Sequence, residues 1–282
     1  MLTISDTKTL REQLVEWHQV GETVALVPTM GNLHKGHMSL VKLAAAQAEH
    51  VVVSVFVNPT QFSADDDFGS YPRTLEKDSR LLSRAGVDIL YNPTVEDIYP
   101  LGIESPTSVS VPILSETLCG EKRPGHFDGV TSVVVRLLNI VSPNVAVFGE
   151  KDYQQLVILR RMVEELHIHT RILAGGTERD EAGLAMSSRN QYLTDAEMLT
   201  APLFYATLCD ARDKFIAGTA SAASIESEAM GKLEAAGFVP HYFSLRRSAD
   251  LSVPDKVAGK LIVLAAAVLG KARLIDNLQF DN

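Results

Sequence analysis

The chain has 282 residues, of which 46% are hydrophobic and 22% charged, and its formal net charge is −9. This composition predicts a globular protein of one larger and one smaller domain, and the acidic balance argues against nucleic-acid binding, because a phosphate backbone requires a concentrated basic surface. The N-terminus lacks the pattern of a secretory leader, apolar runs are too short to span a membrane and the two cysteines form no CxxC pair, so we expect a cytoplasmic protein with reduced thiols.

The first part of the chain alternates short apolar runs with amphipathic stretches, which is the pattern of parallel β-α-β units. The spacing of Leu75, Leu81 and Leu82 predicts that all three face inward, and residues 92–129 are expected to form a long loop with a short strand at 108–111. We predict helices at 7–20, 37–48, 71–86, 129–141 and 149–166, and strands at 23–27, 50–58, 87–91, 144–149 and 167–173.

The pattern changes near Gly176, where glycines and charged residues follow the last of these strands. Beyond it we predict helices at 195–217 and 222–236 and strands at 240–247 and 261–270, and the motif ARLIDN follows at 272–277. The expected fold class is therefore α/β. A Rossmann-like doubly wound parallel sheet of about five strands occupies residues 1–176, and a smaller α+β domain, residues 177–282, covers the site.

The segment Leu26–Leu40 carries the strongest chemical signal, because a strand end, a glycine loop, two histidines and a helix start follow one another. The first turn of a helix has unpaired N–H groups and a partial positive charge, so it stabilises an anion. His34 and His37 are three positions apart, which places both rings on one side of that turn. We interpret the segment as a phosphate cradle. Two alternatives remain open: the histidines only cap the helix or lie on the surface, or they bind zinc, although no Cys or Glu follows at helical spacing as a third ligand.

Three further segments carry polar groups suited to the same kind of ligand. Gln61 follows the second strand, Lys151 and Gln155 open a predicted helix, and Arg189 ends the run Met-Ser-Ser-Arg. A lysine at a helix start opposes the helix dipole unless an anion is bound, and arginine binds phosphate through its fork of N–H groups. Because ligands bind at the carboxyl edge of a parallel sheet, we expect the four segments to converge around a triphosphate and a small polar acid.

These motifs, together with YPRT, RPGHFDGV and the terminal ARLIDN, resemble the pantoate–β-alanine ligase family over nearly the whole chain. That family lies in the nucleotidyltransferase superfamily, which shares HxGH with class I aminoacyl-tRNA synthetases. The resemblance implies an ATP-dependent ligase that condenses (R)-pantoate with β-alanine to pantothenate, AMP and diphosphate through a pantoyl adenylate. It also implies ATP as substrate, Mg²⁺ as cofactor and a cytoplasmic homodimer.

The resemblance further implies roles for individual residues. His37 would be the catalytic proton donor, and His34, Lys151 and Arg189 would face the phosphates with it. The implied ATP site consists of Met30, Gly31, Asn32, Leu33, His34, Lys35, Gly36, His37, Gly149, Glu150, Lys151, Asp152, Glu178, Met186, Ser187, Ser188 and Arg189. The other implied site residues are Gln61 and Gln155 for pantoate, with Gln61 also near β-alanine, Asp78 for magnesium, and Tyr71, Arg123 and His126 as neighbours of the site.

The chain departs from the family pattern at one place. Residues 176–180 read Gly-Thr-Glu-Arg-Asp, where the family usually has a Pro-Thr-Val-Arg-Glu-like run, and Glu178 in this run is the implied contact on the adenine side. Two rival functions remain. A nucleotidyltransferase that keeps the nucleotide on its product would not need the paired glutamines, and a non-catalytic adenylate-binding module would hold ATP without turnover. A tRNA synthetase is disfavoured by the small second domain and the acidic charge.

Overall fold

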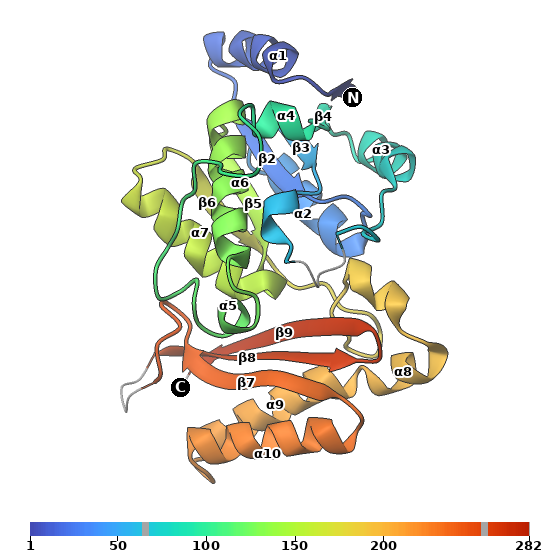
Figure 1. Ribbon diagram of the computed structural model, residues 1–282, viewed down its shortest axis with the longest axis vertical. Helices are drawn as coiled ribbons and strands as arrows, with labels where there is room; N and C mark the ends of the chain where they lie inside the picture. The colour runs from blue at the N-terminus through green and yellow to red at the C-terminus, as the bar shows by residue number, and fades with distance from the viewer. Residues whose placement is uncertain (64–67, 255–258, 282) are drawn as a thin grey trace. The chain divides into compact units, whose positions relative to one another are not determined.

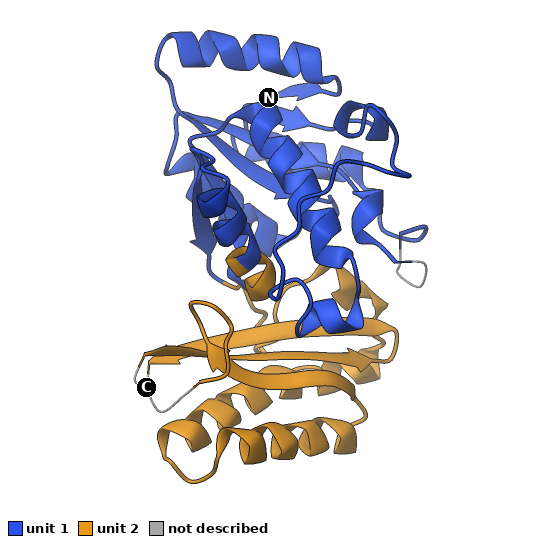
Figure 2. Ribbon diagram, turned by 60° about the vertical axis from the view of Figure 1, so that its left-hand side comes forward, with its two compact units in different colours: residues 1–150, 158–176 blue, residues 151–157, 177–282 orange. Residues whose placement is uncertain are grey.

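The computed structural model describes residues 1–63, 68–254 and 259–281 (Figure 1). Contacts within the chain define two compact units, one of residues 1–150 and 158–176 and the other of residues 151–157 and 177–282 (Figure 2). The predicted division at residue 176 assigned residues 151–157 to the first domain, whereas their contacts group them with the C-terminal part of the chain.

The first unit contains a six-stranded sheet in the order β1-β4-β3-β2-β5-β6, and every neighbouring pair in it is parallel. The strands are β1 (Leu2–Ile4), β2 (Val24–Thr29), β3 (His50–Val55), β4 (Ile89–Tyr91), β5 (Val145–Gly149) and β6 (Arg171–Gly175). From β2 the chain winds outward to β3 and β4, and it later winds the other way through β5 and β6. The topological switch point therefore lies between β2 and β5, and the predicted doubly wound parallel sheet is confirmed.

Helices flank this sheet (Figure 1). Helix α2 buries Leu40, Val41 and Ala44 in one core with alternate residues of β2 and β3, as expected for strands whose side chains point to opposite faces in turn. The helices in this part of the chain are α1 (Thr7–Gln19), α2 (Lys35–Ala45), the 3₁₀ helix η1 (Pro59–Gln61), α3 (Leu75–Arg84), α4 (Val95–Ile98), α5 (Cys119–Lys122), α6 (His126–Val141), η2 (Glu150–Asp152) and α7 (Tyr153–Glu165). Residues 151–157, in η2 and the start of α7, belong to the second unit.

Several local predictions in this unit are wrong. The segment 92–129, expected to be a long loop, contains the short helices α4 and α5, and β1 was not predicted. Leu75 is 38% exposed at the first position of α3, whereas Leu82 is fully buried as predicted. No strand forms at 108–111, because the backbone N–H and carbonyl of Val109 bond to the hydroxyls of Ser132 and Thr131 on α6 rather than to another strand. Polar side chains on a neighbouring helix thus satisfy a segment whose alternating pattern is typical of a strand.

The second unit contains a three-stranded antiparallel sheet whose buried face packs against α9 and α10. Its elements are η3 (Ser188–Tyr192), α8 (Asp195–Thr200), α9 (Leu203–Ile216), α10 (Ala222–Ala235), β7 (Val239–Arg247), β8 (Lys260–Leu269) and β9 (Ala272–Asp281). The single helix predicted at 195–217 is divided at Pro202, which has no N–H to continue the helical bonds. Across the described parts of both units, no helix combines the length and apolar character needed to cross a bilayer.

Helix α6 approaches η1 so closely that Gly129 has no room for a side chain. A Cβ at this position would overlap the backbone of Thr60 and Gln61, whereas Gly231 in α10 has open space around it. Alanine normally stabilises a helix interior by about 0.5–1 kcal/mol relative to glycine, and overpacking costs about 1–3 kcal/mol. We therefore expect Gly129→Ala to destabilise the protein and Gly231→Ala to stabilise it, as measured by urea denaturation. A stabilising effect of both variants would contradict the close packing of α6 on η1.

Candidate active site

The loop between β2 and α2 is held in place by a buried carboxylate. Asp78 is fully buried on α3, and its two oxygens accept the backbone N–H groups of Asn32 and Leu33, each at 2.9 Å. The hydroxyl of Thr74 donates to the same carboxylate at 3.0 Å. Gly31 has φ +84°, a conformation that favours glycine, and a Cβ there would lie 3.2 Å from the Asp78 carboxylate. The loop and α3 therefore fit together closely, at the switch point of the sheet.

The two histidines of HxGH both cap helix α2. The Nδ1 atom of His34 accepts the N–H of Gly36 at 3.2 Å, and the Nδ1 atom of His37 accepts the N–H of His34 at 3.3 Å. Because a backbone N–H can only donate, neither Nδ1 carries a proton in these bonds, so each neutral ring carries its proton on Nε2. The rings lie together, with centroids 4.1 Å apart. The two histidines therefore cap the helix through Nδ1, and in this tautomer Nε2–H is the hydrogen-bond donor of each ring.

Gln61 lies beside the same loop, because its amide nitrogen contacts the Met30 sulfur at 3.2 Å. The amide orientation follows from Asn58, which is 1% exposed and donates through Nδ2 to Gln61 Oε1 and to the Gly129 carbonyl, both at 3.1 Å. The carbonyl can only accept, so the Asn58 amide can point in one way only, and Gln61 must then turn its NH₂ group away from Asn58. Gln61 can therefore donate to an anionic substrate.

Asn58 is itself fixed by residues that the sequence interpretation did not assign to the site. Its Oδ1 accepts the Tyr99 hydroxyl at 2.8 Å and the Thr60 hydroxyl at 3.1 Å. Burial raises the pKa of Tyr99 above its ordinary value, so the phenol stays protonated and can donate. The polar run after the second strand had pointed to this place, but periodicity gave no sign that Asn58 is its centre.

Two of the implied neighbours of the site hold the backbone of Gln61. His126 Nδ1 lies 2.8 Å from the Gln61 carbonyl oxygen, and Arg123 Nη1 lies 2.9 Å from His126 Nε2. A carbonyl accepts and a guanidinium donates, so His126 is neutral here, with its proton on Nδ1. Tyr71, the third implied neighbour, is 7% exposed. Its ring packs edge-on against Phe62, the residue directly after Gln61, with the ring centroids 5.9 Å apart.

This proton assignment can be tested with two amide variants of His126. The amide nitrogen of asparagine can occupy the place of Nδ1, whereas that of glutamine reaches the place of Nε2. For pantoate, the substrate that the family resemblance implies, we expect His126→Asn to keep the KM within about twofold of wild type. His126→Gln is expected to raise this KM by about tenfold, the equivalent of one hydrogen bond of ~1 kcal/mol or slightly more. Initial-rate kinetics with varied pantoate give both values. Equal KM values for the two variants would contradict the assignment.

Gly149 ends β5 and Glu150 begins η2 in the first unit, and the predicted residues from Lys151 onward belong to the second unit. Lys151 is half-buried in η2 and Gln155 half-buried in the first turn of α7, whereas Asp152 and Glu178 are exposed. The predicted adenine contact from Glu178 stays a prediction, and the Glu178 carbonyl accepts the N–H of Met186 at 2.8 Å.

The serine motif begins a short 3₁₀ helix in the same unit. Ser187 is the N-cap of η3 and accepts the N–H of Arg189 at 3.2 Å. The side-chain amide of Asn190 donates a hydrogen bond to the Ala185 carbonyl at 3.0 Å, which holds the turn to the residues before it. Ser188 and Arg189 are half-buried within it.

The predicted magnesium contact at Asp78 stays a prediction. In this structure both oxygens of the carboxylate accept hydrogen bonds from the loop, and one of them also accepts the hydroxyl of Thr74. Within the described residues no three His, Cys, Asp or Glu side chains are grouped as metal ligands, which also gives the zinc alternative no third ligand. Mg²⁺ commonly binds through substrate phosphates and waters with only one or two carboxylates. The described residues therefore provide no dedicated cation cage.

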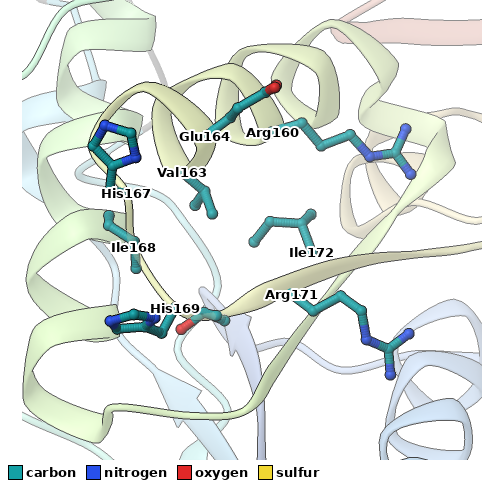
Figure 3. A pocket seen from close by; sticks show the side chains of 9 residues that line it. Arg160, Val163, Glu164, His167, Ile168, His169, Arg171 and Ile172 are labelled. Atoms are coloured by element: carbon teal, nitrogen blue, oxygen red, sulfur yellow. The ribbon is translucent and has the colours of Figure 1, made fainter.

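A separate hollow of about 610 Å³ lies at the opposite edge of the sheet, where α7 ends and β6 begins. The charged ends of Arg160, Glu164 and Arg171 point away from its middle (Figure 3). None of its lining residues is a predicted site residue, and ligands of doubly wound sheets bind at the carboxyl ends of the strands. This hollow is therefore not the candidate site.

A doubly wound sheet with a histidine-capped helix at its switch point defines a nucleotide-binding α/β protein of the HxGH class. The model of the pantoate-beta-alanine ligase family matches residues 2–279. Over 281 residues and the whole of both chains, the sequence is 50% identical to a pantothenate synthetase of Shewanella sp. strain ANA-3 and 49% identical to one of Shewanella oneidensis.

Solved structures give the same result. Pantothenate synthetase from Thermus thermophilus matches with a TM-score of 0.90 and 42% identity over 99% of both chains. Pantoate-beta-alanine ligase from Francisella tularensis, complexed with beta-gamma ATP and beta-alanine, matches with a TM-score of 0.83 and 34% identity over 99% of this chain and 97% of that one. The chain belongs to the pantoate–β-alanine ligase family.

Proposed function

We propose that this chain condenses (R)-pantoate with β-alanine, at the expense of ATP, to give pantothenate, AMP and diphosphate. Family membership over residues 2–279 carries this proposal. The local geometry of the first unit supports it, because two imidazole Nε2–H groups at a helix start and the Gln61 amide adjoin one loop. The Francisella relative, whose crystals hold an ATP compound and β-alanine, supports the same two ligands here.

In the first step a carboxylate oxygen of pantoate attacks the α-phosphorus of ATP, and diphosphate leaves. Negative charge builds on the phosphoryl oxygens, so the reaction needs positioning and fixed positive charge rather than an enzyme nucleophile. Lys151 and Arg189 supply that charge, and the neutral rings of His34 and His37 supply hydrogen bonds from Nε2–H, with His37 as the donor to the reacting phosphoryl group. Good orientation of the two substrates contributes about 7–11 kcal/mol, more than any single side chain.

In the second step the amine of β-alanine attacks the acyl carbon of pantoyl adenylate, and AMP leaves with the oxygen that had joined the two. Gln61 and Gln155 hold the pantoate part, and Gln61 also adjoins the incoming amine. ATP contacts the backbone and side chains of the segments 30–37, 149–152 and 186–189, with Glu178 on the adenine side. Mg²⁺ would neutralise charge on the ATP phosphates, and Asp78 is the contact that the family resemblance implies for it, although both oxygens of this carboxylate accept loop N–H groups. The family resemblance also supports a homodimer in the cytoplasm, which sedimentation velocity and cell fractionation test.

One assay separates this function from its rivals. The protein is incubated with ATP, Mg²⁺ and pantoate, and diphosphate is measured before and after addition of β-alanine. A ligase releases up to one equivalent of diphosphate per site before the addition and turns over after it. Continuous turnover without β-alanine, with the nucleotide retained on a product, would identify the nucleotidyltransferase rival. ATP binding with no diphosphate in either phase would identify a non-catalytic adenylate-binding module.

A further inference from the structure

The terminal motif ARLIDN has no role in the mechanism above, yet it contains two buried polar residues on β9. Asp276 is 4% exposed and Asn277 is 6% exposed, and both lie where β9 pairs regularly with β8. Burying such groups costs free energy unless their hydrogen bonds are made. The partners of these two residues are therefore informative.

Asp276 binds Arg179 in a two-pronged ion pair, with Nη1–Oδ2 at 2.6 Å and Nη2–Oδ1 at 2.8 Å. The same guanidinium donates to the Gly183 carbonyl at 3.1 Å and lies over the Tyr205 ring, 3.4 Å from its centroid. Arg179 and Ala185 pair as the bridge of a small hairpin. The Arg179 side chain starts from one arm, bonds to Gly183 on the other arm and binds Asp276, so it connects both arms to β9. The hairpin leads directly into the serine motif.

Asn277 holds the other phosphate-binding segment of this unit. Its Nδ2 donates to the carbonyl of Lys151 at 3.0 Å, and its backbone N–H donates to Asp276 Oδ1 at 2.8 Å. Adjacent residues of one strand thus fix η2, which carries Lys151, and the hairpin that precedes Ser187. All of these residues belong to the second unit.

We propose that Asn277 is a positioning residue for ATP: it holds the backbone of Lys151 on the strand that also fixes, through Asp276 and Arg179, the approach to Ser187. The proposal rests on the proposed function, in which Lys151 and the serine motif bind phosphate. A fixed charge stabilises a transition state only while its position is maintained, and a displacement of about 1 Å can lower the rate by as much as ~10²-fold.

The decisive variant is Asn277→Asp, which keeps the size of the side chain but places an oxygen against the Lys151 carbonyl in place of the N–H donor. Gln279→Glu is a matched control, because it makes the same amide-to-acid change two positions along β9 and keeps the oxygen that accepts the Tyr153 hydroxyl. Asn277→Ala removes the donor without adding charge, in case the aspartate variant folds poorly.

We expect both Asn277 variants to lower kcat/KM for ATP by about tenfold to a hundredfold with the KM for pantoate within twofold, and Gln279→Glu to keep both values near wild type. Calorimetry with a non-hydrolysable ATP analogue measures the same loss without turnover. Unchanged ATP parameters in both Asn277 variants, or equal losses toward ATP and pantoate that track a lowered Tm, would overturn the positioning role. These outcomes differ from a failure of the proposed function, in which the wild-type protein itself would release no diphosphate.

Discussion

Replacing His37 with alanine is expected to lower the rate of adenylate formation by about 10²–10³-fold while pantoate binding changes far less. In the proposed reaction the Nε2–H group of His37 meets charge that appears on the phosphoryl oxygens only as diphosphate leaves. An interaction of this kind is stronger in the transition state than in the bound substrates, so its loss lowers kcat. Single-turnover quench experiments with ATP and pantoate measure the chemical step directly.

The capping geometry provides variants that separate the two nitrogens of His37. His37→Asn offers an oxygen near the place of Nδ1, so it can still accept the N–H of His34, but it has no donor at the place of Nε2. His37→Gln can place an amide N–H near Nε2. We expect the asparagine variant to be nearly as slow as alanine and the glutamine variant to recover part of the rate. A chemical step that keeps wild-type speed in His37→Ala would remove His37 from catalysis.

Asp78→Asn is expected to destabilise the protein by about 2–3 kcal/mol and to raise the KM for ATP. The carboxylate accepts the N–H groups of Asn32 and Leu33 with separate oxygens, whereas an amide has one oxygen and would turn an NH₂ group toward the other donor. Asp78 is fully buried, so bulk solvent does not reach the group that loses its hydrogen bond. Urea denaturation and ATP saturation curves measure the two effects, and Glu76→Gln, at an exposed position in the same first turn of α3, is the matched control.

A magnesium titration separates loop anchoring from the predicted metal contact at Asp78. If the carboxylate anchors the loop, the remaining activity of Asp78→Asn reaches half-maximum at a magnesium concentration close to that of wild type. A large rise in that concentration, with stability retained, would contradict anchoring as the main role and favour direct metal contact.

Local patterns in the sequence predicted five of the six parallel strands and the strand-loop-helix form of the segment 26–40, but they gave no sign of the short edge strand β1. The β-branched run at 50–55 and the apolar run that ends at Val27 are both buried parallel strands, and HxGH does begin a helix. Helix capping and phosphate binding by the histidines do not exclude each other, because each imidazole ring has two nitrogens. Capping uses Nδ1 and phosphate binding would use Nε2, and the sequence alone cannot assign the two nitrogens.

Contacts between distant segments could not be predicted in this way. Asp78 and Leu33 are 45 positions apart, and Asn277 and Lys151 are 126 positions apart. Such a hydrogen bond joins one side chain to one backbone group, so it produces no repeating pattern of residue types in the sequence. The same reason explains the absent strand at 108–111, since the hydroxyls on α6 that bind Val109 gave no local signal.

The most direct test of the account is an isotope measurement on the released nucleotide. Pantoate labelled with ¹⁸O in its carboxylate is converted with ATP and β-alanine, and AMP is analysed by mass spectrometry. If the carboxylate attacks the α-phosphorus, one labelled oxygen bridges the two groups, and it leaves with AMP when the amine attacks the acyl carbon. The account predicts AMP with one ¹⁸O atom; unlabelled AMP, or label in inorganic phosphate beside ADP, would contradict it.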